Sequence, residues 1–509
     1  MAMPTPIAAT QPISPTSSSQ VNALLGDFAW RALELTYSFP AWESSWSTDF
    51  ALGYGSITAY GEPWNGFTPI STDEQAAFRN VADAWSGPSN MHLVETGETS
   101  ASYGIIRIAK SARADAPFEY AWAYYPSSSE RGGDIWMNTA SPFVESPWVP
   151  GSAAYYTLLH EVGHALGLKH PFDGALTLDP GQDAISSTVM SYDAWAGSPQ
   201  SAFDFYPTTP MRLDIAALQY LYGPPSGSTA DDLYRFDDSR QYHCTLWDAG
   251  GNDTLSYDGR LDAIVDLRPG QGSILGKPVH AYEANTGALL GQPPNVWTAH
   301  DTVIERAILG SGNDTITVHA QMRYLDAGAG LDTLVLPGSA SDYRLTATAH
   351  GFALGEATAP THTLDLRNLE RFVLDEIAYA ADLGADEAAG KTLLAIRSAA
   401  PQYLDDPVTI GNVMKMFDTG LDLRAFFEAL EADGTLDMLF AQYSDAQLAN
   451  LLATNLGGGV ADPDTATHFG QLLAERMPLT DVLAEAASST PNLEFLAYES
   501  STWLAIPFI

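Results

Sequence analysis

The order of apolar and polar positions in the first 225 residues predicts a mixed α/β region. Short runs rich in β-branched or aromatic residues predict strands at 35–39, 103–108 and 121–125. Longer runs predict helices at 72–85, 155–166 and 211–222. Thr72 is the expected N-cap of the first helix, with acidic residues in its first turn. Gly167 is expected to end the second helix, and Gly223 with two prolines the third.

The pattern changes at about residue 226 and again at about residue 384. Between these positions, short β-prone runs alternate with Gly, Asn and Asp and show no helical period, which predicts an all-β domain. Residues 384–509 carry Leu- and Ala-rich helical patterns, with expected N-caps at Thr409, Ser444 and Thr480. We therefore expect a multidomain α+β protein that ends in an α-helical bundle.

The first 20 residues are rich in Pro, Ser, Thr and Ala and contain no Lys or Arg. Such a composition predicts a flexible leader or a short pro-segment rather than a secretory signal peptide. The expected domains are thus 1–20, 21–225, 226–383 and 384–509. Nothing in the sequence demands more than a monomer.

The charge excludes some classes of partner. The chain has 62 acidic residues against 23 Lys plus Arg, a formal charge of −39. Nucleic acids and anionic membranes need a basic face, so neither is an expected partner. The acidic excess suits calcium binding, high solubility or a saline habitat, and composition does not choose among them. No apolar run approaches the roughly 18 residues of a membrane helix, so we expect no transmembrane segment.

Cysteine usage bears on stability. Cys244 is the single cysteine, so no intramolecular disulfide can form, and we expect its side chain to act as a small buried hydrophobe. If the protein is extracellular, bound metal is an expected source of the missing stability.

The string 160–170 reads HEVGHALGLKH and predicts a catalytic zinc site. On a helix, His160 and His164 project from one face and can reach one ion. Gly167 lets the chain turn, so that His170 can supply a third ligand. Three protein ligands leave a position for water, as in catalytic zinc sites. Glu161 is placed to accept a proton from that water during attack on a carbonyl.

Beyond this string, the sequence resembles the metzincin metallopeptidases and, within them, the secreted serralysins. The similar segments are 24–26, 35–40, 132–138, 189–192 and 213–223. The resemblance implies a metzincin zinc peptidase domain over 21–225, one catalytic zinc, and protein or peptide substrates. It also implies that Met190 lies beneath the zinc ligands. Tyr192 would be a further zinc ligand that swings away to stabilise the oxyanion.

Two segments beside the expected cleft bear on substrate binding. Residues 121–126 are expected to form an edge strand, which can pair with an extended substrate with loose side-chain selectivity. An ordinary sheet edge explains them equally well. The loop 171–188 is short for the family, so the resemblance does not define the rim of the primed-side pocket.

Three degenerate turns of the form G-x-G-x-D-x-apolar occur at 249–255, 310–316 and 328–334. Their glycines expose carbonyl oxygens and their aspartates add carboxylates, the hard ligands that calcium prefers. Downstream of a serralysin-like region they predict a short calcium-binding parallel β-roll over 226–383, holding two to four calcium ions. The expected calcium-site residues are Asp248, Gly250, Gly251, Asp253, Glu305, Gly310, Gly312, Asp314, Gly328, Gly330 and Asp332, the first site being implied by the resemblance.

The resemblance also implies export by type I secretion machinery to the extracellular space, with a signal near the C-terminus. The expected function is a broad-specificity zinc endopeptidase. One alternative is a calcium-dependent surface or adhesion protein with a vestigial protease site. Another is a dedicated processing protease with one partner substrate. Residues 384–509 do not resemble the usual end of a serralysin and could dock on the roll, carry the export signal or tether the enzyme to a surface.

Overall fold

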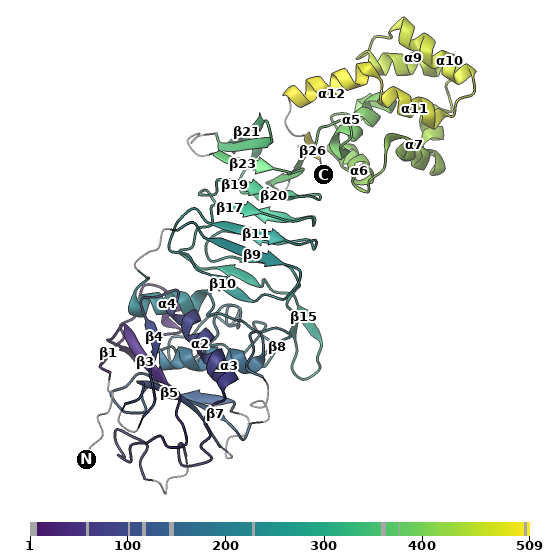
Figure 1. Cartoon of the computed structure of the whole chain (residues 1–509). Coiled ribbons are helices and arrows are strands. Elements are labelled where there is room, and N and C mark those ends of the chain that lie inside the picture. The colour runs from purple at the N-terminus through teal and green to yellow at the C-terminus, as the bar shows by residue number, and fades with distance from the viewer. Residues whose placement is uncertain are drawn as a thin grey trace. The chain divides into compact units, whose positions relative to one another are not determined.

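The structure is a computed structural model that describes residues 8–56, 61–99, 102–113, 119–141, 147–225, 230–357, 363–375, 377–502 and 506–508. The chain folds as two compact units, Met1–Glu305 and Arg306–Ile509. The chain is mixed α/β with a β-rich middle and a helical C-terminal region, as the sequence predicts (Figure 1). Among the described residues, no helix combines the length and apolarity needed to span a bilayer.

A five-stranded sheet organises the N-terminal part of the first unit. Its order is β4-β3-β5-β7-β6, and β6 is antiparallel to β7 whereas the other strands pair in parallel. The strands are β3 (Glu34–Ser38), β4 (His92–Glu95), β5 (Ile106–Ser111), β6 (Ala121–Ala123) and β7 (Ile135–Asn138). Because β6 pairs with β7 alone among the described residues, the expected edge strand is confirmed.

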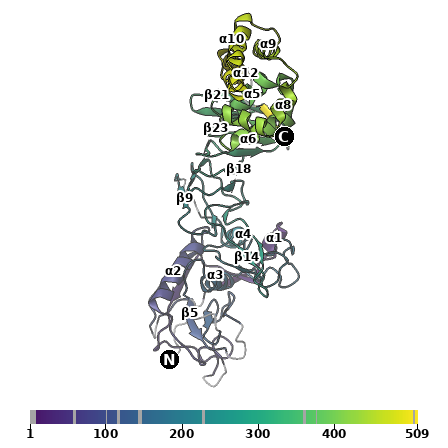
Figure 2. The ribbon, with the colours of Figure 1, turned by 90° about the vertical axis from the view of Figure 1, so that its right-hand side faces the viewer.

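Three helices complete this region: α2 (Thr72–Ser86), α3 (Ala153–Ala165) and α4 (Arg212–Tyr222). Helices α2 and α3 lie side by side (Figures 1 and 2). The indole of Trp85 on α2 donates to the carbonyl of Leu159 on α3 across fully buried apolar surface. All three helices lie within two residues of the predicted ranges. The predicted cap of α2 is wrong by one residue: Ser71 is the N-cap, in a reciprocal capping box with Glu74.

The expectation of a flexible leader is wrong for residues 8–20. Strand β1 (Thr10–Pro12) pairs antiparallel with β2 (Phe28–Trp30), and the short helix α1 (Ser19–Asn22) follows. Ala8 is buried in the main core, and the hydroxyl of Tyr220 donates to the carbonyl of Ser14. These tertiary contacts offset the low intrinsic order of a Pro- and Ser-rich segment.

The rest of the first unit is β structure. Its strands are β8 (Ala202–Phe203), β9 (Leu233–Asp237), β10 (Cys244–Leu246), β11 (Thr254–Asp258), β12 (Ile264–Asp266), β13 (Gly272–Ser273), β14 (Ala281–Tyr282), β15 (Leu289–Gly291) and β16 (Val296–Thr298). Strands β9 and β11 pair in parallel, as do β10 and β16. Cys244 is partly buried, and burial raises the pKa of its thiol to about 12.

The second unit begins with parallel strands and ends with antiparallel strands. The strands are β17 (Arg306–Ile308), β18 (Thr315–Thr317), β19 (Tyr324–Asp326), β20 (Thr333–Leu336), β21 (Tyr343–Thr348), β22 (Gly351–Glu356), β23 (Thr363–Arg367), β24 (Arg371–Leu374), β25 (Ile377–Ala380) and β26 (Ile506–Phe508). Strands β17, β19 and β23 form one parallel set, and β18, β20 and β24 form another. Strand β26 returns from the end of the chain to pair with β25.

Eight helices occupy the described part of residues 388–502: α5 (Ala388–Ala399), α6 (Pro407–Asp418), α7 (Leu423–Ala432), α8 (Thr435–Phe440), α9 (Asp445–Leu456), α10 (Pro463–Ala474), α11 (Leu479–Ala487) and α12 (Thr490–Thr502). They share one apolar core. Ser444 is the N-cap of α9, as predicted. Thr409 and Thr480 lie inside their helices, so those two predicted caps are wrong; Asp406 caps α6, and Pro478 stands at the cap position of α11.

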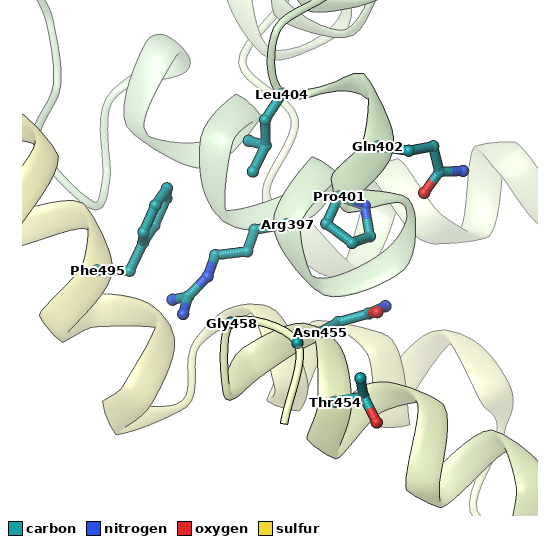
Figure 3. Close-up of a pocket in the computed structure, with 9 residues that line it drawn as sticks. Arg397, Pro401, Gln402, Leu404, Thr454, Asn455, Gly458 and Phe495 are labelled. Atoms are coloured by element: carbon teal, nitrogen blue, oxygen red, sulfur yellow. The ribbon is translucent and has the colours of Figure 1, made fainter. Parts of the chain in front are cut away.

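A pocket of about 450 Å³ opens among these helices, and Arg397 and Phe495 lie next to each other in its lining (Figure 3). The guanidinium of Arg397 lies 4.1 Å from the ring centroid of Phe495. It also donates to the carbonyls of Leu456 and Pro491. Since Arg397 is buried and bonded to the ends of other helices, its contacts hold the helices together.

Candidate metal centre

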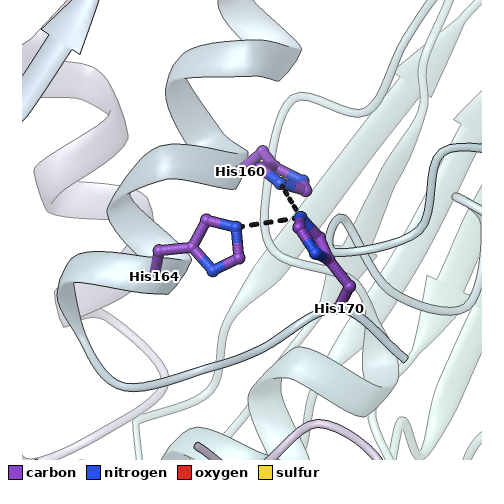
Figure 4. A group of neighbouring side chains, drawn as sticks. All are labelled: His160, His164 and His170. Carbon is purple, nitrogen blue, oxygen red and sulfur yellow. Dashed lines mark hydrogen bonds between the residues drawn. The ribbon is translucent and has the colours of Figure 1, made fainter. Parts of the chain in front are cut away.

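Helix α3 and the loop after it bring three histidines together (Figure 4). His160 and His164 lie one turn apart on α3, and Gly167, with φ of 103°, reverses the chain toward His170. The Nε2 atom of His170 lies 3.2 Å from Nε2 of His160 and 3.1 Å from Nε2 of His164. Tetrahedral zinc with Zn–N bonds near 2.05 Å places its ligands roughly 3.3 Å apart. Both distances from His170 therefore match the spacing of zinc ligands, and all three ligand atoms lie within 4.8 Å of one another.

Each imidazole is oriented through its other nitrogen. Nδ1 of His160 lies 2.7 Å from the carbonyl of Val189, and Nδ1 of His164 lies 2.7 Å from that of Leu168. Nδ1 of His170 lies 2.8 Å from the Asp173 carboxylate. Since these oxygens only accept, each Nδ1 carries the proton and donates it, which leaves three Nε2 lone pairs facing one another. Three converging lone pairs fit a cation between them.

The protonation states favour metal binding. Burial lowers the pKa of His160 well below its usual value, and it lowers the pKa of His164 to about 4. Both rings are therefore neutral near pH 7, the form that binds a metal ion. The ligand nitrogens of the three histidines all lie within 4.8 Å of one another.

Glu161 follows the first histidine on α3 and is buried. Burial raises the pKa of its carboxyl to about 8. Its Oε2 atom has no hydrogen-bond partner among the described residues. A buried carboxylate oxygen without a partner is costly, so this atom is suited to receive a proton or a water that the metal site would bring.

Tyr192 and Met190 lie on either side of the histidines. The hydroxyl of Tyr192 is 2.7 Å from Nε2 of His170, the nitrogen that also faces the other two histidines. Met190 is fully buried, and its sulfur packs against the Cα of Gly163, between the two histidines of α3. The structure thus brings Tyr192 next to His170 and Met190 next to the helix that carries the other two histidines.

A buried carboxylate holds the segment that carries Met190. Asp214, at the start of α4, accepts hydrogen bonds from the backbone of Val189 and Met211 at 2.8 Å each. It also accepts one from the hydroxyl of Thr188. Burial raises the pKa of Asp214 to about 7, and these hydrogen bonds act in the opposite direction. Sequence reasoning missed Asp214 because its partners are set by tertiary structure.

Aromatic rings line the exposed side of the centre. Phe172 stacks on His170 with ring centroids 5.0 Å apart and an interplanar angle of 8°, while 43% of its surface stays exposed. Tyr125, just beyond the edge strand β6, contacts His164 with centroids 5.3 Å apart. A peptide beside β6 would therefore meet apolar ring faces next to the histidines.

The first expected calcium site is a cluster of carboxylates. Asp248 and Asp253 are buried, and they form with Asp232 a group whose ligand atoms lie within 4.8 Å of one another. The backbone of Asp253 donates to the carboxylate of Glu305 at 2.8 Å. Burial, together with nearby Asp248 and Glu305, raises the pKa of Asp253 to about 6.

Two glycines beside this cluster are required for different reasons, Gly250 by its backbone conformation and Gly251 by close packing. Gly250 has φ of 121°, and a Cβ on Gly251 would lie 2.2 Å from the carbonyl of Ala230. These turns therefore require glycine, as the sequence predicts. Asp232 was not predicted, because no turn motif precedes it.

The second and third turns stack on each other in the second unit. A Cβ on Gly328 would lie 2.0 Å from the carbonyl of Gly310, and one on Gly330 2.1 Å from that of Gly312. The backbone of Asp314 donates to the carboxylate of Asp332 at 2.8 Å.

The apolar residue that ends each turn is fully buried, as the repeat predicts: Leu255, Ile316 and Leu334. The backbone of Asp332 donates to the carboxylate of Glu370 at 2.9 Å, just as that of Asp253 donates to Glu305. Glu370 was not predicted as a calcium-site residue. Its position after the third turn, which corresponds to that of Glu305 after the first, could have indicated it.

Comparisons with known proteins agree with the motif. Residues 212–391 match the family described as Peptidase M10 serralysin C terminal. Serralysin from Proteus mirabilis is 30% identical over 322 residues, covering 56% of this chain and 59% of that protein. Serralysin C from Dickeya chrysanthemi is 31% identical over 290 residues, covering 51% and 56%. Serralysin from Photorhabdus sp. (strain Az29) is 27% identical over 340 residues, covering 59% and 63%.

The chain therefore spans between half and two thirds of the length of these relatives. The matched C-terminal region starts inside α4 and ends inside α5, so it contains the whole series of Gly- and Asp-rich turns. The zinc motif and the flanking segments resemble the same family. Over the matched residues, the chain is thus similar to serralysins.

Proposed function

We propose that this protein is a secreted zinc-dependent endopeptidase with a metzincin catalytic domain over residues 21–225. One observation carries the proposal: Nε2 of His170 lies 3.1–3.2 Å from Nε2 of both His160 and His164, while every Nδ1 is held by an oxygen acceptor. Zinc bound there would polarise the scissile carbonyl and make a bound water acidic.

The chain's own residues supply the remaining chemistry. Glu161 accepts the proton of the attacking water and returns it to the leaving amine, a role suited to its buried and otherwise unpartnered Oε2 atom. Tyr192 supports the developing oxyanion through the hydroxyl that lies beside His170. The edge strand β6 aligns an extended substrate, and the partly exposed rings of Phe172 and Tyr125 offer it apolar contacts beside the histidines.

The proposal includes a calcium-binding parallel β-roll over 226–383 and an α-helical domain over 384–509. The clustered carboxylates of Asp232, Asp248 and Asp253 support the first calcium site. The stacked glycines and aspartates of 310–332 support a second. Because calcium is scarce inside cells, its binding would complete folding after export by type I secretion machinery.

A proteolysis assay tests the function. The full chain is incubated with casein in millimolar calcium, with and without 1,10-phenanthroline, which removes zinc in preference to calcium. We expect cleavage that phenanthroline abolishes. The variant Glu161→Gln should lose at least about a hundredfold in rate while still binding one zinc.

Glu283→Gln is the matched control, because it makes the same chemical change in the exposed β14–β15 turn, away from the histidines. It should keep nearly full activity. If folded, zinc-loaded wild-type protein leaves casein intact, the broad endopeptidase is wrong. A full rate in Glu161→Gln would refute the assigned role of that residue.

A further inference from the structure

Lys169 lies between two of the proposed zinc ligands and contacts four backbone carbonyls. Its Nζ atom is 2.5 Å from the carbonyl of Ala23, 2.7 Å from that of Asp173 and 3.0 Å from that of Leu176. The carbonyl of His170 is 3.3 Å away. An ammonium group has three N–H donors, so all of them are used within this group of oxygens.

Three of these carbonyls belong to the loop that carries the third histidine. The loop runs from His170 to Leu176 and turns at Gly174, where φ is 77°. Within it, Asp173 accepts the Nδ1 hydrogen bond that orients His170. The ammonium thus contacts the backbone of both the proposed ligand and the residue that orients it.

The fourth carbonyl ties this loop to the N-terminal segment. The backbone of Lys169 donates to the carbonyl of Leu24 at 2.8 Å, and the backbone of Gly26 donates to that of Gly167 at 2.9 Å. A Cβ on Gly26 would lie 2.8 Å from the same oxygen of Gly167. Hydrogen bonds to residues 23–26 therefore hold the start of the loop in place.

We infer that Lys169 is a positioning residue for the metal centre. Its ammonium group draws together the carbonyls of the 170–176 loop and fixes them to Ala23, so that His170 is in place before metal binds. Without the ammonium group, four converging carbonyl oxygens would repel one another and the loop would open. The inference rests on the proposed function, because it takes the three histidines as a zinc site.

Zinc affinity tests this role directly and needs no substrate. Competition with a chromogenic chelator is measured on the full chain in millimolar calcium, together with thermal unfolding of the zinc-free protein. Lys169→Met keeps an unbranched side chain, one atom shorter, and removes the donors. We expect zinc to bind at least about tenfold more weakly, as for other residues that support metal ligands, with zinc-free unfolding close to that of the wild type.

Two further variants separate position from charge and from general packing. Lys169→Arg keeps the charge on a planar group that cannot donate to the four carbonyls at once, and it should not restore the affinity. Lys391→Met is the matched control, because Lys391 also donates to a carbonyl, that of Leu421 in the helical region. It should bind zinc as the wild type does.

Wild-type zinc affinity in Lys169→Met would overturn the inference, and so would full recovery in Lys169→Arg. If Lys169→Met does not fold, Lys169→Gln gives the same test with a milder change, and a failure of both to fold would assign Lys169 to general stability instead. A wild-type protein that binds no zinc contradicts the proposed function, which is a separate result.

Discussion

Met190 and Gly163 fit together only because residue 163 has no side chain. A Cβ atom at position 163 would lie 2.4 Å from the sulfur of Met190 and 3.3 Å from the ring of Trp85. Gly163 is in the middle of α3, where glycine costs a helix about 1 kcal/mol relative to alanine. Gly163 therefore lowers the helix propensity of α3 but lets Met190 and Trp85 pack against the helix beneath the histidines.

Gly163→Ala should destabilise the zinc-free protein by about 1–2 kcal/mol, because overpacking of the buried sulfur outweighs the gain in helix propensity. Urea unfolding with phenanthroline and calcium present measures the effect. In the Met190→Ala background the same substitution should cost less, since the space has been vacated. A Gly163→Ala protein as stable as the wild type would show that the contact is not tight.

Asp214→Ala should lower the free energy of unfolding by about 2–4 kcal/mol, because the buried backbone donors of Val189 and Met211 lose their acceptor. Chemical denaturation measures this loss. Asp179→Ala is the control, because exposed Asp179 accepts one hydrogen bond within a turn and should cost less than about 1 kcal/mol. Equal effects of the two substitutions would contradict the special role of Asp214.

Protonation of Asp134 should make the free energy of unfolding fall as the pH rises from about 4 to about 7. Burial raises the pKa of this carboxyl from 3.8 to about 7, although Tyr54 and the backbone of Arg107 donate to it. In this range the folded state holds a proton that the unfolded state releases, so raising the pH favours unfolding. Above the folded pKa the effect is complete.

The variant Asp134→Asn removes this titration. Any pH-independent loss of stability caused by the substitution can be separated from the pH dependence of the free energy of unfolding. The difference in unfolding free energy, variant minus wild type, should increase with pH between about 4 and 7 and then level off. Urea unfolding at four pH values in calcium measures it. A difference that does not change with pH would show that Asp134 is ionised in the folded protein throughout.

Glu305→Gln and Glu370→Gln should each reduce the rise in melting temperature that calcium produces. Both carboxylates accept from the backbone of a turn aspartate, Asp253 and Asp332 respectively, beside the proposed calcium sites. Calcium titrations followed by differential scanning fluorimetry measure the effect. Glu283→Gln, in the exposed β14–β15 turn, should respond as the wild type does. An unchanged calcium midpoint in both test variants would remove these residues from the sites.

The zinc motif was readable from sequence because its geometry is local. His164 is four positions after His160, and that spacing alone sets them on one helix face. Gly167 stands where the chain must reverse, and its φ of 103° agrees. Asp214 and Lys169 carry no such local signal. Besides local partners, Asp214 binds Val189, 25 residues away, and Lys169 binds Ala23, 146 residues away. Only the folded chain reveals these distant contacts.

Errors in local structure arose where two neighbouring residues could serve equally well. Ser71 and Thr72 are both good N-caps, and Ser71 is favoured because Glu74 then stands three residues on, at the right distance for a capping box. The leader illustrates a different failure. Its composition predicts disorder, yet pairing with β2 and burial of Ala8 outweigh that tendency.

The pairing of β26 with β25 has a consequence for how the protein is made. Residues 381–505 separate the two strands, so the ribosome completes the helical region before β26 can reach its partner. Until then β25 presents open backbone donors and acceptors, the kind of edge through which unfinished chains associate. Folding of this sheet during synthesis therefore carries a risk of aggregation that folding of the finished chain avoids.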